Sequence, residues 1–142
     1  LNINLDNTNQ IVAGASMGGL MSMKTSILFP QFRNIISLSP AFWFGYPSVL
    51  HDIKNLSNES STYLYTGKKE GHIFGDHVKN IFPNNWDLDF SNNDDFYYSG
   101  VKNIKDSFDS NNKKVIFSFQ DNGSHNETSW ATAVLEILGK LI

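Results

Sequence analysis

The residues best suited to chemistry form the run Gly-Ala-Ser-Met-Gly-Gly at positions 14–19. This run follows the apolar segment 10–13 and precedes a helix-forming stretch, so the sequence predicts a strand, a sharp turn and a helix. In Gly-x-Ser-x-Gly, the serine takes unfavourable backbone angles and stands exposed at the end of the strand. Gly14 and Gly18 are expected to be needed because a Cβ at either position would strike the strand or the helix. Ser16 is therefore the candidate nucleophile, and the helix N-terminus would direct free N–H groups at a developing oxyanion.

A serine nucleophile needs a base, and His125 is the best placed of the histidines His51, His72, His77 and His125. It follows the apolar and β-branched run 114–119, which is typical of a buried strand. It precedes residues 127–142, whose apolar positions have helical spacing. His125 is thus expected in a loop at the carboxyl end of a strand, where open α/β sheets hold their catalytic groups. We interpret it as the general base.

The third member of such a site is a carboxylate that orients the histidine and stabilises its charged form. Glu70 is the nearest acid after the predicted strand 61–66 and is the first candidate. Asp76 lies beyond the same strand and is the alternative. The chain order serine, acid, histidine differs from that of the two large serine protease folds.

Four apolar runs without polar alternation predict strands that are covered on both faces, as in a parallel sheet. Helical segments lie between them, which predicts right-handed crossovers and an α/β three-layer sandwich. The strands are expected at 10–15, 34–39, 61–66 and 114–119, and the helices at 18–29, 48–55, 96–110 and from 127 onward.

Two segments do not follow this alternation. Residues 1–9 are typical of a helix tail and a polar loop. Residues 71–95 scatter apolar side chains, Trp86 among them, between polar ones, and we interpret this segment as irregular packing over the core rather than a lid-like insertion. The same segment holds His72 and His77, but their spacing and the absence of converging ligands argue against a metal site.

An aromatic cluster at 42–47 follows the second predicted strand and is expected at the same edge of the sheet as Ser16. Substrate pockets are mostly apolar with a few polar anchors. Trp43 is the candidate pocket residue from this cluster.

Four segments in this order resemble the successive signatures of a family of esterases with the α/β-hydrolase fold. The family includes enterochelin (siderophore) esterases, feruloyl esterases and esterase D. The resemblance implies Ser16 as nucleophile, Glu70 as acid, His125 as base and the Met17 amide as one oxyanion donor. One departure is Ser124, where many relatives have glycine. The four segments are Gly-Ala-Ser-Met-Gly-Gly at 14–19, Ser-Leu-Ser-Pro-Ala-Phe-Trp at 37–43, Tyr-Thr-Gly-Lys-Lys-Glu at 65–70, and Gly-Ser-His-Asn-Glu at 123–127 with Trp130.

The activity implied by this resemblance is hydrolysis of a small-molecule ester through an acyl-enzyme, without a cofactor or a metal. A siderophore, a feruloyl ester and a short-acyl ester are all compatible with it. The alternatives are an acyltransferase or a peptidase on the same fold, and a binding module of this fold without catalysis.

The length and composition set the remaining bounds. The 142 residues make one domain, yet domains of this family are about twice as long, so we expect residues 1–142 to be the C-terminal part, without the N-terminal strands and the second oxyanion donor. There is no cysteine for disulfides or thiolate metal sites, and a net charge of −3 gives no footprint for nucleic acid. No apolar run reaches the ~20 residues that a membrane helix needs. The cytoplasm is the favoured compartment, and a homo-oligomer is left open.

Overall fold

Four parallel strands, neighbours in sequence order, form the sheet that carries the candidate site. The computed structural model describes residues 10–82 and 88–141. The sheet has the order β1-β2-β3-β4, and every neighbouring pair is parallel. The strands are β1 (Gln10–Ala15), β2 (Phe32–Leu38), β3 (Ser61–Lys69) and β4 (Lys114–Ser124). The parallel α/β architecture expected from the sequence is confirmed.

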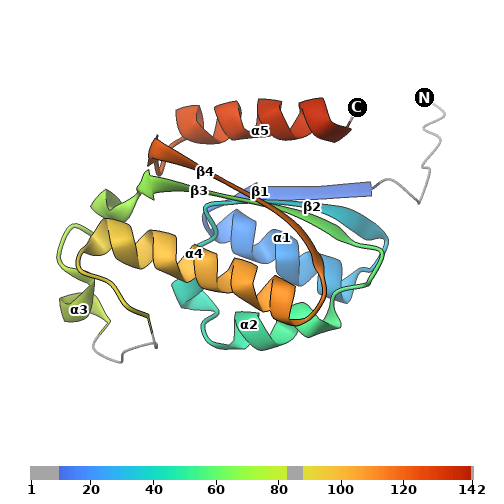
Figure 1. Ribbon diagram of the computed structural model, residues 1–142, viewed down its shortest axis with the longest axis horizontal. Helices are drawn as coiled ribbons and strands as arrows, with labels where there is room; N and C mark the ends of the chain where they lie inside the picture. The colour runs from blue at the N-terminus through green and yellow to red at the C-terminus, as the bar shows by residue number, and fades with distance from the viewer. Residues whose placement is uncertain (1–9, 83–87, 142) are drawn as a thin grey trace.

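Helices cover both faces of this sheet (Figure 1). On one face lie α1 (Met17–Leu28), α2 (Ser48–Asp52) and α4 (Asn93–Ser110), while α5 (Glu127–Leu141) lies on the other. Short helical turns complete the connections: η1 (Phe42–Phe44), η2 (Ile53–Asn55), η3 (Gly71–Phe74) and α3 (Val78–Ile81). Ser16 is the single residue between β1 and α1, and His125 is the first of two residues between β4 and α5, so each is held between a strand and a helix.

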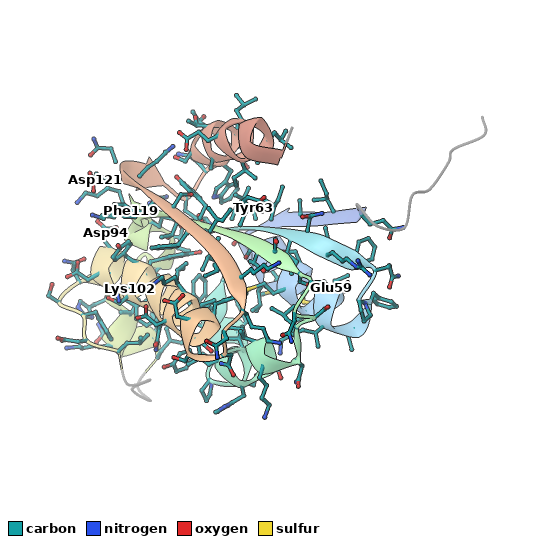
Figure 2. All side chains as sticks on the ribbon, turned by 45° about the vertical axis from the view of Figure 1, so that its right-hand side comes forward. Glu59, Tyr63, Asp94, Lys102, Phe119 and Asp121 are labelled. Carbon is teal, nitrogen blue, oxygen red and sulfur yellow. The ribbon has the colours of Figure 1, made fainter. Side chains whose placement is uncertain are left out.

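Each face of the sheet has its own core, because successive side chains of a strand point to opposite faces. Ile35 and Leu64 belong to the larger core beneath α1, α2 and α4, which the apolar side of α4 fills from Phe96 to Phe108. Ile36 and Tyr63 belong to the smaller core, which α5 covers with Ala133 and Ile137. Figure 2 shows Tyr63 on the α5 side of the sheet. The three layers are therefore joined by two separate sets of apolar contacts.

The expectation that every strand is covered on both faces is wrong for the two outer strands. Ile11 on β1 and Ile116 on β4 are each 44% exposed in the described residues. The central strands β2 and β3 hold the fully buried side chains Ile35 and Leu64. An apolar run thus predicted the strands correctly without distinguishing central strands from outer ones.

The strands β3 and β4 run further than expected, and this places the site residues. β3 continues to Lys69 and β4 to Ser124, so that Glu70 and His125 follow their strands without an intervening loop. The extension depends on an irregularity between Gly67 and Lys69, where the register with β4 shifts. An ion pair of 2.8 Å between the exposed side chains of Lys68 and Asp121 links the two strand ends. Figure 2 shows Asp121 at the opposite end of the sheet from Glu59.

The described residues of the segment 71–95 pack on the larger core through side chains such as Phe74, Val78 and Phe90. This agrees with irregular packing rather than a lid. Trp86 and residues 1–9 lie outside the described residues. Within the ranges 10–82 and 88–141, no helix has the length and apolar character needed to cross a bilayer.

Candidate active site

Ser16 occupies a sharp turn between β1 and α1, with φ 55° and ψ −120°. This is a positive-φ conformation, which a residue with a Cβ adopts only at a cost of about 1–3 kcal/mol. Both backbone groups of Ser16 are engaged: its N–H donates to Leu38 O at 2.9 Å, and its carbonyl accepts from Gly19 N at 3.0 Å and Ala41 N at 3.0 Å. The end of β2 and the turn after it thus hold Ser16 in the strained conformation.

The glycines around Ser16 have different roles from those expected. A Cβ at Gly14 would lie 2.3 Å from the carbonyl oxygen of Gly18, so Gly14 is needed. A Cβ at Gly18 would meet nothing within 4 Å in the described part of the chain, so the expected clash at Gly18 is not found. The close contact belongs to Gly19 instead, where a Cβ would lie 2.7 Å from Leu38 O. The turn needs glycine where α1 passes under the end of β2, one position later than the motif alone indicated.

His125 lies between the end of β4 and the start of α5. The Asn126 side chain accepts the Ser129 amide at 3.0 Å, which caps α5, and the Ser124 amide donates to Ser129 Oγ at 3.0 Å. These bonds fix the two residues on either side of His125. The side chain of His125 is 10% exposed, so it is nearly but not completely buried.

The imidazole of His125 bridges the other two candidate residues. Nε2 lies 2.9 Å from Ser16 Oγ, and Nδ1 lies 2.8 Å from Glu70 Oε2. An ionised carboxylate only accepts hydrogen bonds, so Nδ1 carries the proton of the neutral ring. Nε2 is then the acceptor and faces the Ser16 hydroxyl, which donates. This is the tautomer a general base needs.

Glu70 is completely buried at the end of β3. Its Oε1 accepts from the Ser39 hydroxyl at 2.7 Å and from the Gly67 amide, while Oε2 accepts from His125. A buried carboxylate is costly unless hydrogen bonds replace its hydration. Three donors from three different segments do so here.

Ser39 is a residue of this site that the sequence did not single out for a role. It is fully buried, has a φ of 43°, and follows β2 directly. Its hydroxyl lies between Glu70 and the indole Nε1 of Trp130, which donates to it at 3.0 Å. The signal in the sequence is a Ser-Pro pair at the end of a buried strand, but the side-chain contacts cross 31 and 91 residues and are not readable from it.

Two aromatic rings flank His125. The Trp130 ring lies 4.9 Å away, nearly perpendicular, and the Tyr97 ring lies 5.3 Å away. Burial, and then the negative charge of Glu70, raise the pKa of Tyr97 well above its usual 10.0. The Tyr97 hydroxyl therefore stays a donor, to Ser39 O at 2.6 Å. Both rings thus pack against the imidazole that meets Ser16 and Glu70.

Met17 is the first residue of α1, and its side chain is 39% exposed. The amides of the first turn of a helix have no acceptor within that helix. The Met17 amide thus lies next to Ser16 at the positive end of a helix dipole, where negative charge is stabilised.

Trp43 is half-buried, and its ring packs against Tyr97 at 5.2 Å and Phe74 at 4.9 Å. The Tyr97 ring therefore lies between Trp43 and His125. A cavity of about 630 Å³ opens nearby, lined by residues that include Lys69, Gly71 and His72, but Trp43 does not line it. The structure does not place Trp43 in that cavity.

The remaining candidates lie apart from these contacts. Asp76 is exposed and accepts from the His77 amide at 2.6 Å and from Asn80, so it is Glu70 and not Asp76 that meets His125. His72 and His77 use Nδ1 on the Lys69 carbonyl and the Lys79 amide. In the described ranges, no group of three or more histidine, cysteine, aspartate or glutamate side chains could hold a metal ion.

Comparison with known proteins shows the fold but not a family. No family model and no curated protein matches this sequence. Fifteen chains of solved structures are similar. One is a ferulic acid esterase, with a TM-score of 0.64 and 12% sequence identity over 94% of this chain and 50% of that one. The chain thus has the fold of part of an esterase structure and spans about half of its length.

Proposed function

We propose that Ser16, His125 and Glu70 are the catalytic triad of a serine carboxylesterase with the α/β-hydrolase fold. The observation that carries this proposal is the unbroken row of hydrogen bonds from Ser16 Oγ through His125 to Glu70, at 2.9 and 2.8 Å. The strained φ of Ser16 and the fold shared with an esterase structure support it.

In the proposed reaction, His125 Nε2 takes the Ser16 proton as Ser16 Oγ attacks the ester carbonyl. Glu70 stabilises the imidazolium that forms, and the Met17 amide donates to the oxyanion. His125 returns the proton to the leaving alcohol, which leaves an acyl group on Ser16. Water then attacks the acyl carbonyl as His125 takes its proton, and the acid is released as the bond to Ser16 Oγ breaks and His125 returns the proton to that oxygen. The cycle uses no cofactor and no metal.

We propose the ester hydrolysis as an activity of the complete protein rather than of this chain alone. The similar esterase is about twice as long as the part that this chain matches. We infer that a segment preceding the described residues completes the hydrolase domain and supplies the second oxyanion donor, which in this fold comes from an earlier loop.

The substrate we propose is a small ester, with aromatic acyl esters as the first to test. The similar structure is a ferulic acid esterase. The partly buried ring of Trp43 packs on Tyr97, which in turn flanks His125, and aromatic side chains are common in the walls of small-molecule pockets. Siderophore esters and short-acyl esters are the other substrates in the assay.

The test replaces Ser16 by alanine in the complete protein and measures turnover of p-nitrophenyl acetate and of a feruloyl ester. We expect a loss on the order of 10⁴-fold or more with unchanged folding. The matched control is Ser26→Ala, because Ser26 is a buried serine of the same helix α1 whose hydroxyl donates to Phe32 O, at the end of the helix far from Ser16.

A fluorophosphonate probe gives a second measurement that needs no substrate. It is expected to label the wild type and Ser26→Ala on Ser16, and to leave Ser16→Ala unlabelled. Turnover by Ser16→Ala close to that of the wild type would overturn the proposed function.

A further inference from the structure

The hydrogen bonds around Ser39 have a fixed direction. The indole of Trp130 can only donate, so Ser39 Oγ accepts from Nε1 at 3.0 Å. The single hydroxyl proton of Ser39 is then free to point at Glu70 Oε1, 2.7 Å away, which as a carboxylate oxygen only accepts. One row of hydrogen bonds thus runs from Trp130 through Ser39 to Glu70. A second row runs from Ser16 through His125, and the two rows meet at the Glu70 carboxylate.

We propose that Ser39 is a positioning residue of the site: its hydroxyl, oriented by Trp130, holds the Glu70 carboxylate with Oε2 facing His125. This inference rests on the proposed function. Ser39 touches neither His125 nor Ser16 through this hydroxyl, so it acts on the reaction through Glu70.

Two donors on one oxygen set the rotation of the carboxylate. The Gly67 amide approaches Oε1 from β3, and the Ser39 hydroxyl approaches it from the end of β2. Turning the carboxylate away from His125 therefore breaks two hydrogen bonds at once. Glu70 and Ser39 are both fully buried, so water does not replace a lost donor. Without Ser39, the Gly67 amide is the one remaining donor to Oε1 in the described part of the chain, and the carboxylate is held less firmly in the rotation that faces His125.

The backbone of Ser39 indicates that the hydroxyl, rather than the main chain, makes serine suitable at this position. A φ of 43° suits glycine better than any residue with a Cβ. The main-chain bonds of Ser39, to Tyr65 O at 2.7 Å and from the Tyr97 hydroxyl at 2.6 Å, would be available to glycine as well. What glycine would lose is the donor to Glu70.

This contrast supplies the experiment, which uses the complete protein. Ser39→Gly removes the hydroxyl and relieves the backbone, whereas Ser39→Thr keeps the hydroxyl and strains the backbone further with a β-branched side chain. We expect Ser39→Gly to remain folded, because relief of the positive φ offsets part of the lost hydrogen bond, yet to lose about 10- to 100-fold in kcat, with KM changed less than about threefold, as for a lost hydrogen bond to a charged group. Ser39→Thr is expected to be less stable, with kcat per folded molecule within about threefold of the wild type.

Two further variants complete the set. Trp130→Phe keeps a ring beside His125 but removes the donor to Ser39, and is expected to lose less in kcat than Ser39→Gly. Ser26→Ala, a buried serine remote from Glu70, is expected to match the wild type.

A second readout does not depend on turnover. The His125 Nδ1 proton, bonded to Glu70, is followed by NMR as a downfield resonance. We expect it to be sharp in the wild type and Ser39→Thr, and broadened by exchange with water in Ser39→Gly. Absence of ester turnover in the wild type would refute the proposed function, while the resonance would still test the role of Ser39. The inference is overturned if Ser39→Gly keeps both the sharp resonance and kcat within about twofold, or if stability and kcat fall together in both Ser39 variants.

Discussion

Replacing Gly14 and Gly18 by alanine, one at a time, separates two glycines that the Gly-x-Ser-x-Gly pattern treats alike. At Gly14 the new Cβ would lie 2.3 Å from the Gly18 carbonyl oxygen, far inside the 3.0 Å below which Cβ contacts essentially never occur. The obstacle is backbone, so the turn itself has to widen. At Gly18 the new Cβ would meet nothing within 4 Å in the described structure, and the position lies in the first turn of α1.

The expected effects therefore have opposite signs. Gly14→Ala is expected to cost about 1–3 kcal/mol of stability or more, as overpacking against a rigid neighbour does. A shift of about 1 Å in Ser16 would also lower turnover by about 10²-fold. Gly18→Ala is expected to gain about 0.5–1 kcal/mol, because alanine loses less conformational entropy than glycine in a helix, and to keep full turnover.

The assay is thermal unfolding together with turnover of p-nitrophenyl acetate for both variants and the wild type. At about 2–4 °C per kcal/mol for a domain of this size or larger, the two melting temperatures are expected on opposite sides of the wild type. Equal losses in stability or in activity for the two variants would refute the geometric reasoning.

Two further predictions concern the buried groups under the site. Glu70→Gln is expected to lower kcat by about 10⁴-fold. An amide cannot accept at both ends from Ser39, Gly67 and His125, so the imidazole takes the wrong tautomer. The measurement is kcat compared with that of Ser26→Ala, and a fall of less than tenfold would contradict the prediction. Burial, and then the charge of Glu70, raise the pKa of Tyr65 from 10.0 to about 12. Between these two pH values the folded state keeps a proton that the unfolded state has lost. The resulting stability is fully present below pH 10 and is lost as the pH rises through about 12. The advantage of the wild type over Tyr65→Phe in denaturant unfolding is therefore expected to shrink by at most about 2–3 kcal/mol between pH 8 and pH 12, and a constant difference would contradict the shift.

The positions of Ser16, Glu70 and His125 could be inferred from the sequence because of a property of parallel sheets. All carboxyl ends of the strands meet at one edge, so a polar residue just after each apolar run is brought toward the others whatever the exact packing. The expected strand ends were too early by three residues for β3 and five for β4. The error did not matter for the site, since each strand simply ran on to the residue before Glu70 or His125.

Two features could not be inferred in the same way: the contacts of Ser39, and the finding that the close approach requires glycine at Gly19 rather than at Gly18. Both depend on how closely two elements approach in space. Gly19 is needed because a Cβ at this position of α1 would lie only 2.7 Å from Leu38 O. Ser39 matters because α5 brings the Trp130 indole to its hydroxyl. No local pattern contains the distance between α1 and β2 or between α5 and β2.

The register of the sheet explains why the four polar residues meet as closely as they do. Ala15 is paired with Leu38, so Ser16 and Ser39 are the next residues of two neighbouring strands. Lys69 is paired with Ser124, and the residues that follow them are Glu70 and His125. The second pairing exists only because of the irregularity after Gly67, which is paired with Gln120: β4 uses four residues where β3 uses two. An even number of extra residues preserves the face to which each side chain points, whereas a slip of one would turn His125 to the other face. The irregular stretch of β4 is thus what aligns His125 with Glu70, and the hydrogen bond between them depends on sheet register as much as on the two side chains.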